Sequence, residues 1–183
     1  MAKYFILFIA VLPVALSGQD IYLGGKAGLN YAGISGENGI TYDKVLKYHA
    51  GATAEFSFSE TLSVQPEILF STAGAKSGNS EIDLSYLSIP LLIKYYAVEE
   101  LFSIDIGGQF SYLMDYKVIL DGEHVENNLS YESNEIALVF GATVKTYHKV
   151  FFQTRYLLGI SEIDTAGKNR NGIFQISVGY QFK

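Results

Sequence analysis

The sequence predicts an all-β protein, namely an eight-stranded antiparallel up-and-down transmembrane β-barrel preceded by a cleaved signal peptide. Three observations predict this fold class. Eight segments alternate between two kinds of residue with the two-residue period of a β-strand. One face of every segment is uncharged, although charged residues make up 17% of the chain. Long and short connections alternate between successive segments, as they do in membrane barrels.

The first residues predict a secretory signal peptide that spans residues 1–18. Lys3 is the one charge in this segment, an apolar run extends from Tyr4 to Leu16, and the small residues Ser17 and Gly18 follow. The alternative is a membrane anchor, but this run is shorter than the roughly twenty residues that a spanning helix needs. We therefore expect cleavage within Ser17–Gln19 and a barrel domain over residues 19–183.

The first four expected strands cover residues 21–31, 47–58, 62–71 and 86–96. Within residues 21–31, Leu23 and Leu29 fall on one face and Lys26 on the other. The outer face of the next three strands consists of Tyr48, Ala50, Ala52, Ala54, Phe56 and Phe58, then Leu62, Val64, Pro66, Ile68 and Phe70, then Leu87, Ile89, Leu91, Ile93 and Tyr95.

Two of these segments contain a proline, which removes a backbone donor from a strand ladder. We expect a bulge or a local break in pairing at Pro66 and at Pro90. The competing interpretation is that these two segments are not strands.

The last four expected strands cover residues 102–112, 134–145, 150–158 and 174–182. Their outer positions are Phe102, Ile104, Ile106, Phe110 and Tyr112, then Ile136, Leu138, Phe140, Ala142 and Val144, then Val150, Phe152, Thr154, Tyr156 and Leu158, and finally Phe174, Ile176, Val178, Tyr180 and Phe182. Aromatic residues fall near both ends of the strands, which is typical of the two interfaces of a membrane.

The opposite face of the segments predicts a barrel interior filled by paired charges. An eight-stranded barrel is just wide enough to be filled by side chains, and charges that point into it need partners because they lose their hydration. Four cations and four anions share this face: Lys26, Lys94, Lys145 and Arg155 with Glu55, Glu67, Asp105 and Glu135. We predict a lumen network with a structural role and no measurable conductance.

Alternation alone does not separate a membrane barrel from a soluble one of lipocalin type, which would have an apolar lumen and a polar exterior. The connections favour the membrane. We expect long ones over about residues 32–46, 73–83, 115–133 and 161–171, and short ones over 59–61, 97–100 and 146–149. Short periplasmic turns and longer extracellular loops are the rule for outer-membrane barrels, so both termini are expected in the periplasm.

Several motifs resemble one family along the whole mature chain. KAGLNYAGISG, QPEILFSTAGAK, YLSIPLLIKYY and VGYQF resemble the bacterial outer membrane protein β-barrel domain family, often labelled porin family protein, which includes PorT-type secretion-associated proteins. The resemblance implies a location in the outer membrane of a Gram-negative bacterium. It also implies an assembly signal for the barrel assembly machinery at Phe174, Ile176, Val178, Tyr180 and Phe182, although Lys183 follows the last aromatic residue where such proteins usually end.

The residues that could support chemistry are scattered. His49, His124 and His148 fall in separate parts of the chain and predict no shared metal site. The only candidate site for an outer-membrane enzyme consists of Glu123, His124 and Glu126. The preferred interpretation of this segment is a solvated polar loop. The basic, glycine-containing GKNRNG at 167–172 lacks the strand-loop-helix context of a phosphate site. We expect no enzyme activity, no cofactor and no metal.

The sequence thus predicts a non-enzymatic envelope scaffold with extracellular loops. The expected partners are outer-membrane lipids, the barrel assembly machinery and an envelope or secretion partner bound through the loops, the last as the PorT resemblance implies. A formal net charge of −6 argues against nucleic acid, which binds basic surfaces. The alternatives are a secreted lipocalin-like barrel and, ranked lower, an outer-membrane enzyme or a small pore.

Overall fold

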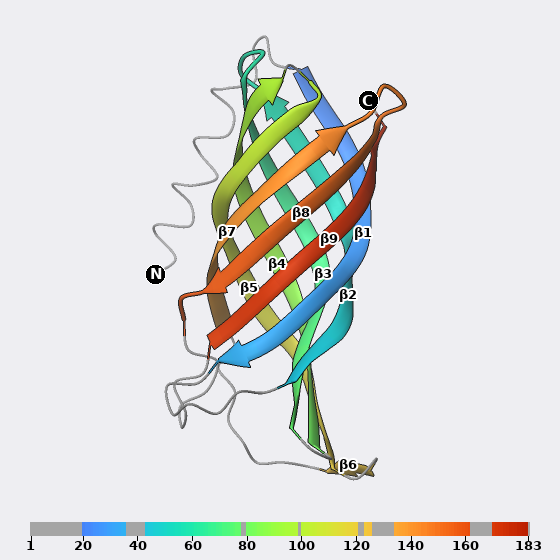
Figure 1. The fold of residues 1–183 in the computed structure, drawn as a ribbon, viewed down its shortest axis with the longest axis vertical. Coiled ribbons are helices and arrows are strands. Elements are labelled where there is room, and N and C mark those ends of the chain that lie inside the picture. Colours follow the sequence, from blue (N-terminus) through green and yellow to red (C-terminus); the bar gives the residue numbers. More distant parts are fainter. Residues whose placement is uncertain are drawn as a thin grey trace.

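The computed structural model describes residues 20–35, 43–77, 80–98, 100–120, 123–125, 134–161 and 170–182, and the predicted signal peptide at 1–18 lies outside them. Nine strands are present in these residues (Figure 1): β1 Asp20–Ser35, β2 Asp43–Ser57, β3 Leu62–Ser77, β4 Ser80–Val98, β5 Phe102–Leu120, β6 Glu123–Val125, β7 Asn134–Lys145, β8 Val150–Gly159 and β9 Arg170–Gln181. Nothing described here forms a helix long and apolar enough to cross a membrane.

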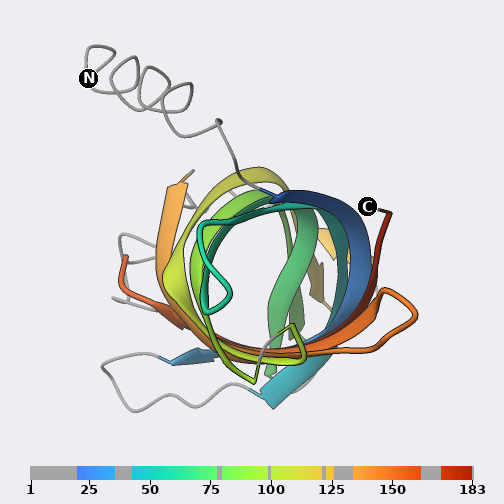
Figure 2. The same ribbon diagram turned by 90° about the horizontal axis from the view of Figure 1, so that it is seen from above.

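Eight of these strands close into one antiparallel barrel, which confirms the predicted eight-stranded all-β architecture. The hydrogen-bonded order is β4, β3, β2, β1, β9, β8, β7, β5, and a pairing between β4 and β5 closes the ring, as the view along the barrel in Figure 2 shows. The first and last barrel strands pair from Gly24↔Gln181 to Ser35↔Arg170. The short β6 adds to one end of β5 outside the ring.

The strand register is unchanged at both prolines, so no bulge forms there. The local break in pairing that was the other expectation is present, since the β3–β4 ladder is interrupted between Pro66↔Leu91 and Leu69↔Ser88, which keep the same register. Pro90 pairs in register with Gln109. Both segments are strands, and the register shifts lie elsewhere: between Lys44 and His49 in β2, and between Ser85 and Tyr86 and between Tyr96 and Val98 in β4.

One predicted loop is largely strand. Residues 73–83 were expected to form a long connection, but β3 and β4 continue to pair from Ala73↔Leu84 to Ser77↔Ser80, so that two residues, 78–79, connect them. β5 likewise continues to Leu120 along β4. The result is a sheet of β3, β4 and β5 that extends past the rest of the barrel at the lower end of Figure 1, where β6 joins it. We call this lower end the loop end and the opposite end the turn end.

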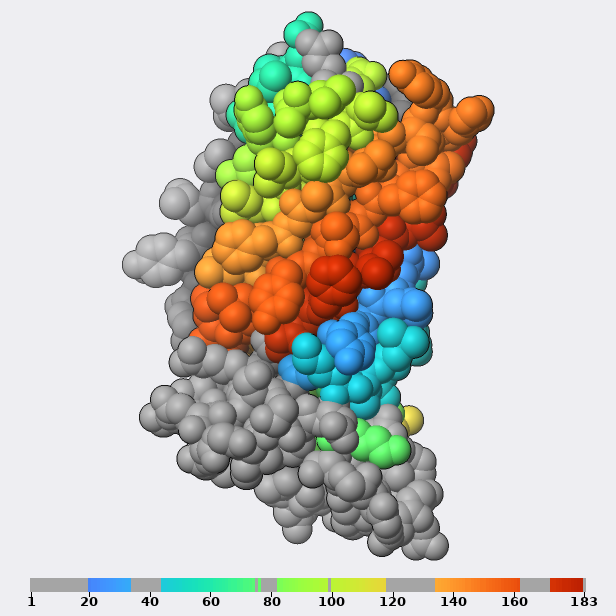
Figure 3. Space-filling view, in the orientation of Figure 1, coloured from blue at the N-terminus to red at the C-terminus, as the bar shows by residue number. Residues whose placement is uncertain are grey.

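The two faces of the barrel wall differ in chemistry. Large apolar side chains lie exposed on the outer face along all eight barrel strands, for example Leu29, Tyr48, Ile68, Ile93, Ile106, Phe140, Phe152 and Ile176. On the side drawn in Figure 3, the side chains of β1, β7, β8 and β9 form one continuous outer surface. A soluble barrel would instead bury its apolar face and expose its polar one.

The interior contains an apolar cluster that the sequence analysis did not predict. It gathers inward-facing residues mainly in the loop-end half of the barrel: Ala32, Ala73, Leu84, Tyr86, Leu92, Ala137, Val139, Leu157 and Ile173. Four of them, Leu92, Val139, Leu84 and Leu157, are among the least exposed side chains of the chain. The lumen is therefore charged in its middle, and toward the loop end it combines an apolar cluster with buried polar residues such as Asn30 and Glu135.

Tight curvature explains two inward-facing glycines. A Cβ on Gly28 would lie 2.1 Å from the carbonyl oxygen of Ile176, and one on Gly51 would lie 2.0 Å from that of Ile68. Neither position has room for a side chain because the neighbouring strand's backbone crosses there, which is a common reason for glycine inside a strand.

Candidate functional site

The middle of the lumen is organised around Glu67 on β3. Its carboxylate lies 2.8 Å from Lys26 Nζ of β1. It also accepts two hydrogen bonds from the Arg155 guanidinium of β8, Nη1 at 2.9 Å and Nη2 more closely, and one from the Gln65 amide at 2.5 Å. The side chains of Lys26, Glu67 and Arg155 are inaccessible to solvent. This bidentate arrangement is the strong form of an arginine–carboxylate pair.

A second cluster surrounds Asp105 on β5. Lys94 Nζ of β4 lies 3.1 Å from one carboxylate oxygen and donates at 2.9 Å to the Thr143 hydroxyl. Asp105 also accepts from the Thr143 hydroxyl at 2.6 Å and from the Ser103 hydroxyl at 2.7 Å. All of these groups are buried. A buried ion pair needs several hydrogen-bond partners to offset its lost hydration, and both charges have them here.

Gln153 on β8 joins the two clusters. Its amide nitrogen donates to Asp105 at 2.9 Å, and its amide oxygen accepts from Lys26 Nζ at 3.0 Å. Gln153 and Thr143 share the inward parity of the charged residues on their strands, but both are neutral, so the pattern of charges along the sequence did not predict their place in the network.

A third cluster lies at the turn end of the lumen. Glu55 on β2 accepts from Lys145 Nζ of β7 at 2.8 Å, from the Tyr96 hydroxyl at 2.5 Å and from the Gln181 amide at 3.1 Å. Lys145 Nζ also lies 4.8 Å from the centre of the Tyr96 ring and 5.5 Å from that of Tyr22. The ammonium is thus held by one carboxylate and two aromatic faces.

His49 belongs to the interior of the barrel. It is 1% exposed. Nδ1 lies 2.6 Å from Asn30 Oδ1 and Nε2 lies 2.8 Å from the Ser177 hydroxyl. His49 lies within β2 between the exposed Tyr48 and Ala50, so its side chain points into the lumen. Its two ring nitrogens are both engaged by neutral groups, which is typical of a structural histidine.

The remaining predicted residues lie apart. Glu135 is buried on β7. The outward residues of the last strand, Phe174, Ile176, Val178, Tyr180 and Phe182, are all exposed, and the Phe182 N–H donates to the Leu23 carbonyl at 2.7 Å. Glu126 lies outside the described residues, while the backbones of Glu123 and His124 pair with β5. The three histidines do not converge, since His148 lies in the turn before β8.

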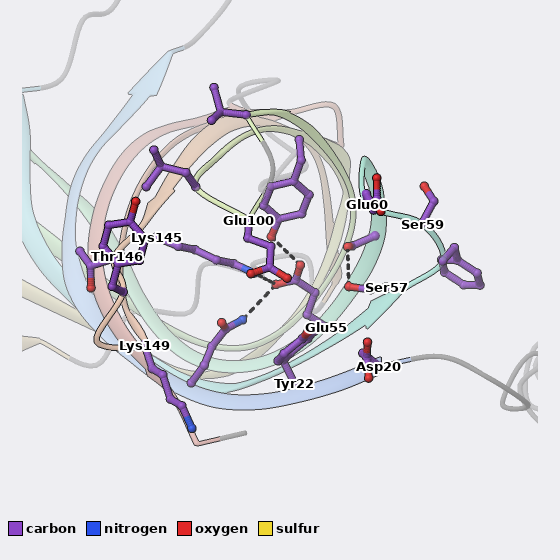
Figure 4. Close-up of a pocket in the computed structure, with 17 residues that line it drawn as sticks. Asp20, Tyr22, Glu55, Ser57, Ser59, Glu60, Glu100, Lys145, Thr146 and Lys149 are labelled. Atoms are coloured by element: carbon purple, nitrogen blue, oxygen red, sulfur yellow. Dashed lines mark hydrogen bonds and ion pairs between the residues drawn. The ribbon is translucent and has the colours of Figure 1, made fainter.

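A cavity of about 660 Å³ opens beside the third cluster at the turn end. Figure 4 looks into this cavity, with Glu55 inside the ring of strands and Asp20, Glu60 and Lys149 at its margin. Its walls combine the ends of the strands with the three short turns, and its polar lining includes Asp20, Tyr22, Glu55, Ser57, Glu60, Tyr96, Glu100, Lys145, Lys149 and Gln181. The sequence analysis did not predict it, because a cavity depends on how the strand ends converge.

These groups lack the arrangement of a metal centre. Within the described parts of the chain, no three His, Cys, Asp or Glu side chains are placed to hold a metal ion. The Ser177 hydroxyl lies 2.8 Å from His49 Nε2, as a nucleophile lies beside its base, but both side chains are buried inside the lumen. Glu55, Glu67 and Asp105 are each engaged by cations and donors, which neutralises their charge inside the lumen. The arrangement can fill and stiffen the barrel, and at the turn end it presents charged groups to a solvent-accessible cavity.

Comparisons with known proteins agree with this architecture. A family model described as "Outer membrane protein beta-barrel domain" matches residues 17–165. No curated protein matches the sequence. Among solved structures, the attachment invasion locus protein Ail of Yersinia pestis is similar with a TM-score of 0.58 and 15% identity, covering 88% of this chain and 98% of Ail. Neisserial surface protein A, NspA, has a TM-score of 0.60 and 14% identity, covering 91% of this chain and 100% of NspA.

Proposed function

The chain belongs to the outer membrane protein β-barrel domain family, and from this premise we propose that it is a non-enzymatic scaffold that meets partners at its loop end. The observation that carries the proposal is the filled lumen. The side chains of Lys26, Glu67 and Arg155 in its middle are inaccessible to solvent, and an apolar cluster follows toward the loop end. A barrel of this width filled in this way has no room for a water column.

The outer face of the barrel wall is suited to contact with lipid. Its exposed apolar side chains suit lipid chains, and a charge at the middle of that face would cost roughly 2–4 kcal/mol. The wall is thus committed to lipid outside and to packing inside. Function on such a scaffold resides in the connections, which is where binding residues usually lie on rigid folds.

The proposal includes a topology. Residues 1–18 direct export and are removed, and residues 19–183 form the barrel. The described chain begins and ends at the turn end, and its turns at 58–61 and 146–149 are short, as periplasmic turns are. Both termini then lie in the periplasm and the loop end faces outward. The outward residues of β9 act as the signal for the barrel assembly machinery, as the family resemblance implies.

The extension of β3, β4 and β5 past the barrel is the part best suited to a partner. It projects beyond the apolar face and carries charges such as Lys117, which lies opposite Asp83 in the ladder. Asp83 also pairs with Lys47 of β2. A secretion partner, as in PorT-type proteins, or another envelope protein would meet this ordered surface.

Removing the tip of the extension tests the proposal. The variant lacks 74–77 and 80–83, so residues 78–79 connect Ala73 directly to Leu84, which are partners in the present ladder. An even number of residues leaves each strand, which keeps every side chain on its face. The matched control is Tyr147→Ser, a change at a 97% exposed turn-end residue.

The measurement is cross-linking and capture from intact cells, with a heat-shifted gel band as the check that each barrel is folded. We expect the shortened variant to lose the captured partner and the control to keep it. In planar bilayers the purified protein should give no single-channel steps. Capture that survives the shortening, or regular conductance steps from the folded barrel, would overturn the proposal.

A further inference from the structure

We propose that the turn-end cavity is a binding site for an organic polycation, a ligand that carries two or more separated ammonium or guanidinium groups. This goes beyond the scaffold function, which concerns the opposite end of the barrel. The cavity, of about 660 Å³, lies within the range of roughly 300–1,000 Å³ that small-molecule sites occupy.

The charges of the cavity favour a cation. Glu55 and Lys145 form an ion pair with each other on its inner wall. Three further carboxylates line it, those of Asp20, Glu60 and Glu100, against the single ammonium of Lys149. None of these three carboxylates forms a salt bridge within the described part of the chain. A cleft lined mainly by one sign of charge concentrates ligands of the opposite sign.

The spacing of the carboxylates favours an extended ligand over a metal ion. They come from different elements: Asp20 begins β1, while Glu60 and Glu100 lie in the turns before β3 and β5. No group of three such side chains among the described residues is close enough to hold one metal ion. A ligand that satisfies them must therefore carry its positive charges at separate points, as polyamines and lysine-rich peptides do.

The inner wall already shows how such a group is held. Lys145 Nζ lies over the rings of Tyr96 and Tyr22 at 4.8 and 5.5 Å. Both rings line the cavity. Aromatic faces beside carboxylates form the environment that binds ammonium ligands, and here the protein supplies one such group from its own chain.

Two turns beside the cavity have charged residues at positions with a positive φ, a backbone conformation that favours glycine. Glu100 has a φ of 54° and Lys149 a φ of 64°, and both line the cavity. Side chains are disfavoured in this left-handed region, and such positions often accompany functional sites. Figure 4 shows Glu100 over the opening and Lys149 at its edge, so both charges lie where a ligand would enter.

The cavity ends inside the barrel. Beyond Glu55 and Lys145 the lumen continues into the buried Asp105 and Glu67 clusters, so a bound ligand enters and leaves at the turn end. An anion would suit the site poorly, because Lys145 is taken by Glu55 and only Lys149 remains to oppose three carboxylates. The structure thus favours reversible capture of a polycation and not its passage.

The test is binding of two probes to the folded full-length barrel in lipid nanodiscs, measured by isothermal titration calorimetry at low and high salt. Spermidine represents a free polyamine, and tetralysine represents a basic segment of a protein. The test variant combines Asp20→Asn, Glu60→Gln and Glu100→Gln at three exposed positions, and its heat-shifted gel band checks that it is folded. The matched control is Asp115→Asn, an exposed carboxylate at the loop end.

We expect at least one probe to bind the unmodified barrel, and the triple variant to bind it about tenfold more weakly, equivalent to ~1.4 kcal/mol. The Asp115→Asn control should bind as the unmodified barrel does, and added salt should weaken binding. Preference for spermidine or for tetralysine identifies the source of the polycation. Failure of both probes to bind at millimolar concentration, or an equal loss in the triple variant and the control, would overturn the proposal without bearing on partner capture at the loop end.

Discussion

Neutralising Glu67 is the most informative single change in the lumen. The substitution Glu67→Gln keeps the size of the side chain and removes its charge. It leaves the Lys26 ammonium and the Arg155 guanidinium without their shared counterion, although both remain buried. The carboxylate now accepts from Lys26 at 2.8 Å, from Gln65 at 2.5 Å and from two Arg155 nitrogens. An amide oxygen cannot serve all of these donors.

The expected cost follows from the burial of the two cations. Removing one partner of a buried ion pair costs about 3–5 kcal/mol, since the other charge is left without compensation. Because Lys26 also donates to Gln153, we expect the lower part of this range, about 3 kcal/mol. The matched control is Asp83→Asn, which breaks the partly exposed pair with Lys47. A surface pair of that kind contributes at most about 1 kcal/mol.

The assay is reversible unfolding in urea in the presence of lipid vesicles, monitored by far-UV circular dichroism and by the heat-shifted gel band. Slopes of about 1–3 kcal/mol/M are typical of urea, so 3 kcal/mol lowers the midpoint by roughly 1–3 M. A second variant makes the cause specific. Adding Lys26→Met to Glu67→Gln removes one stranded cation and should recover part of the loss, as coupled neighbours do.

Two results would refute this reasoning. One is a Glu67→Gln barrel that loses no more stability than the Asp83→Asn control. The other is a double variant whose loss of stability equals the sum of the losses measured for Glu67→Gln alone and for Lys26→Met alone, because the two charges would then not interact.

Two further predictions concern the turns and the outer wall. Lys149→Gly should raise the free energy of unfolding by about 0.5–1 kcal/mol, since glycine relieves the positive φ at some cost in unfolded-state entropy; an unchanged or lower urea midpoint would contradict this. Ile176→Arg, at a 59% exposed position in the middle of β9, should cost roughly 2–4 kcal/mol in lipid vesicles, whereas Ile176→Leu should leave the midpoint almost unchanged. An arginine variant as stable as the leucine variant would show that this face does not meet lipid.

Some features of the barrel could be predicted because they follow from local rules. The two-residue period assigns Leu29 and Ile176 to one face and Lys26 to the other, whatever the strands pair with. The uncharged outer face then indicates a membrane. The hairpin between β3 and β4 was missed although Gly78–Asn79 is a sequence suited to a two-residue turn. The polar residues around it were taken for a loop.

Other features depend on residues far apart in the chain. His49 lies inside the expected strand 47–58, but its hydrogen-bond partners Asn30 and Ser177 come from β1 and β9. The apolar cluster was missed because residues such as Ala73 were assigned to a loop and inward residues such as Val139 were overlooked beside the charged ones. Composition shows neither feature, because both depend on where strands end and which strands meet in space.

The sequence by itself determined the number of barrel strands and the side on which most residues fall, because strand geometry repeats every two residues. The tertiary structure decided which charges meet. Glu67 on β3 contacts Lys26 on β1 and Arg155 on β8, and neither of these strands is next to β3 in the ring. The contacts form because side chains reach across the lumen of a closed barrel. The same closure brings Asp20, Glu60 and Glu100 around one cavity, and no spacing along the chain records that meeting.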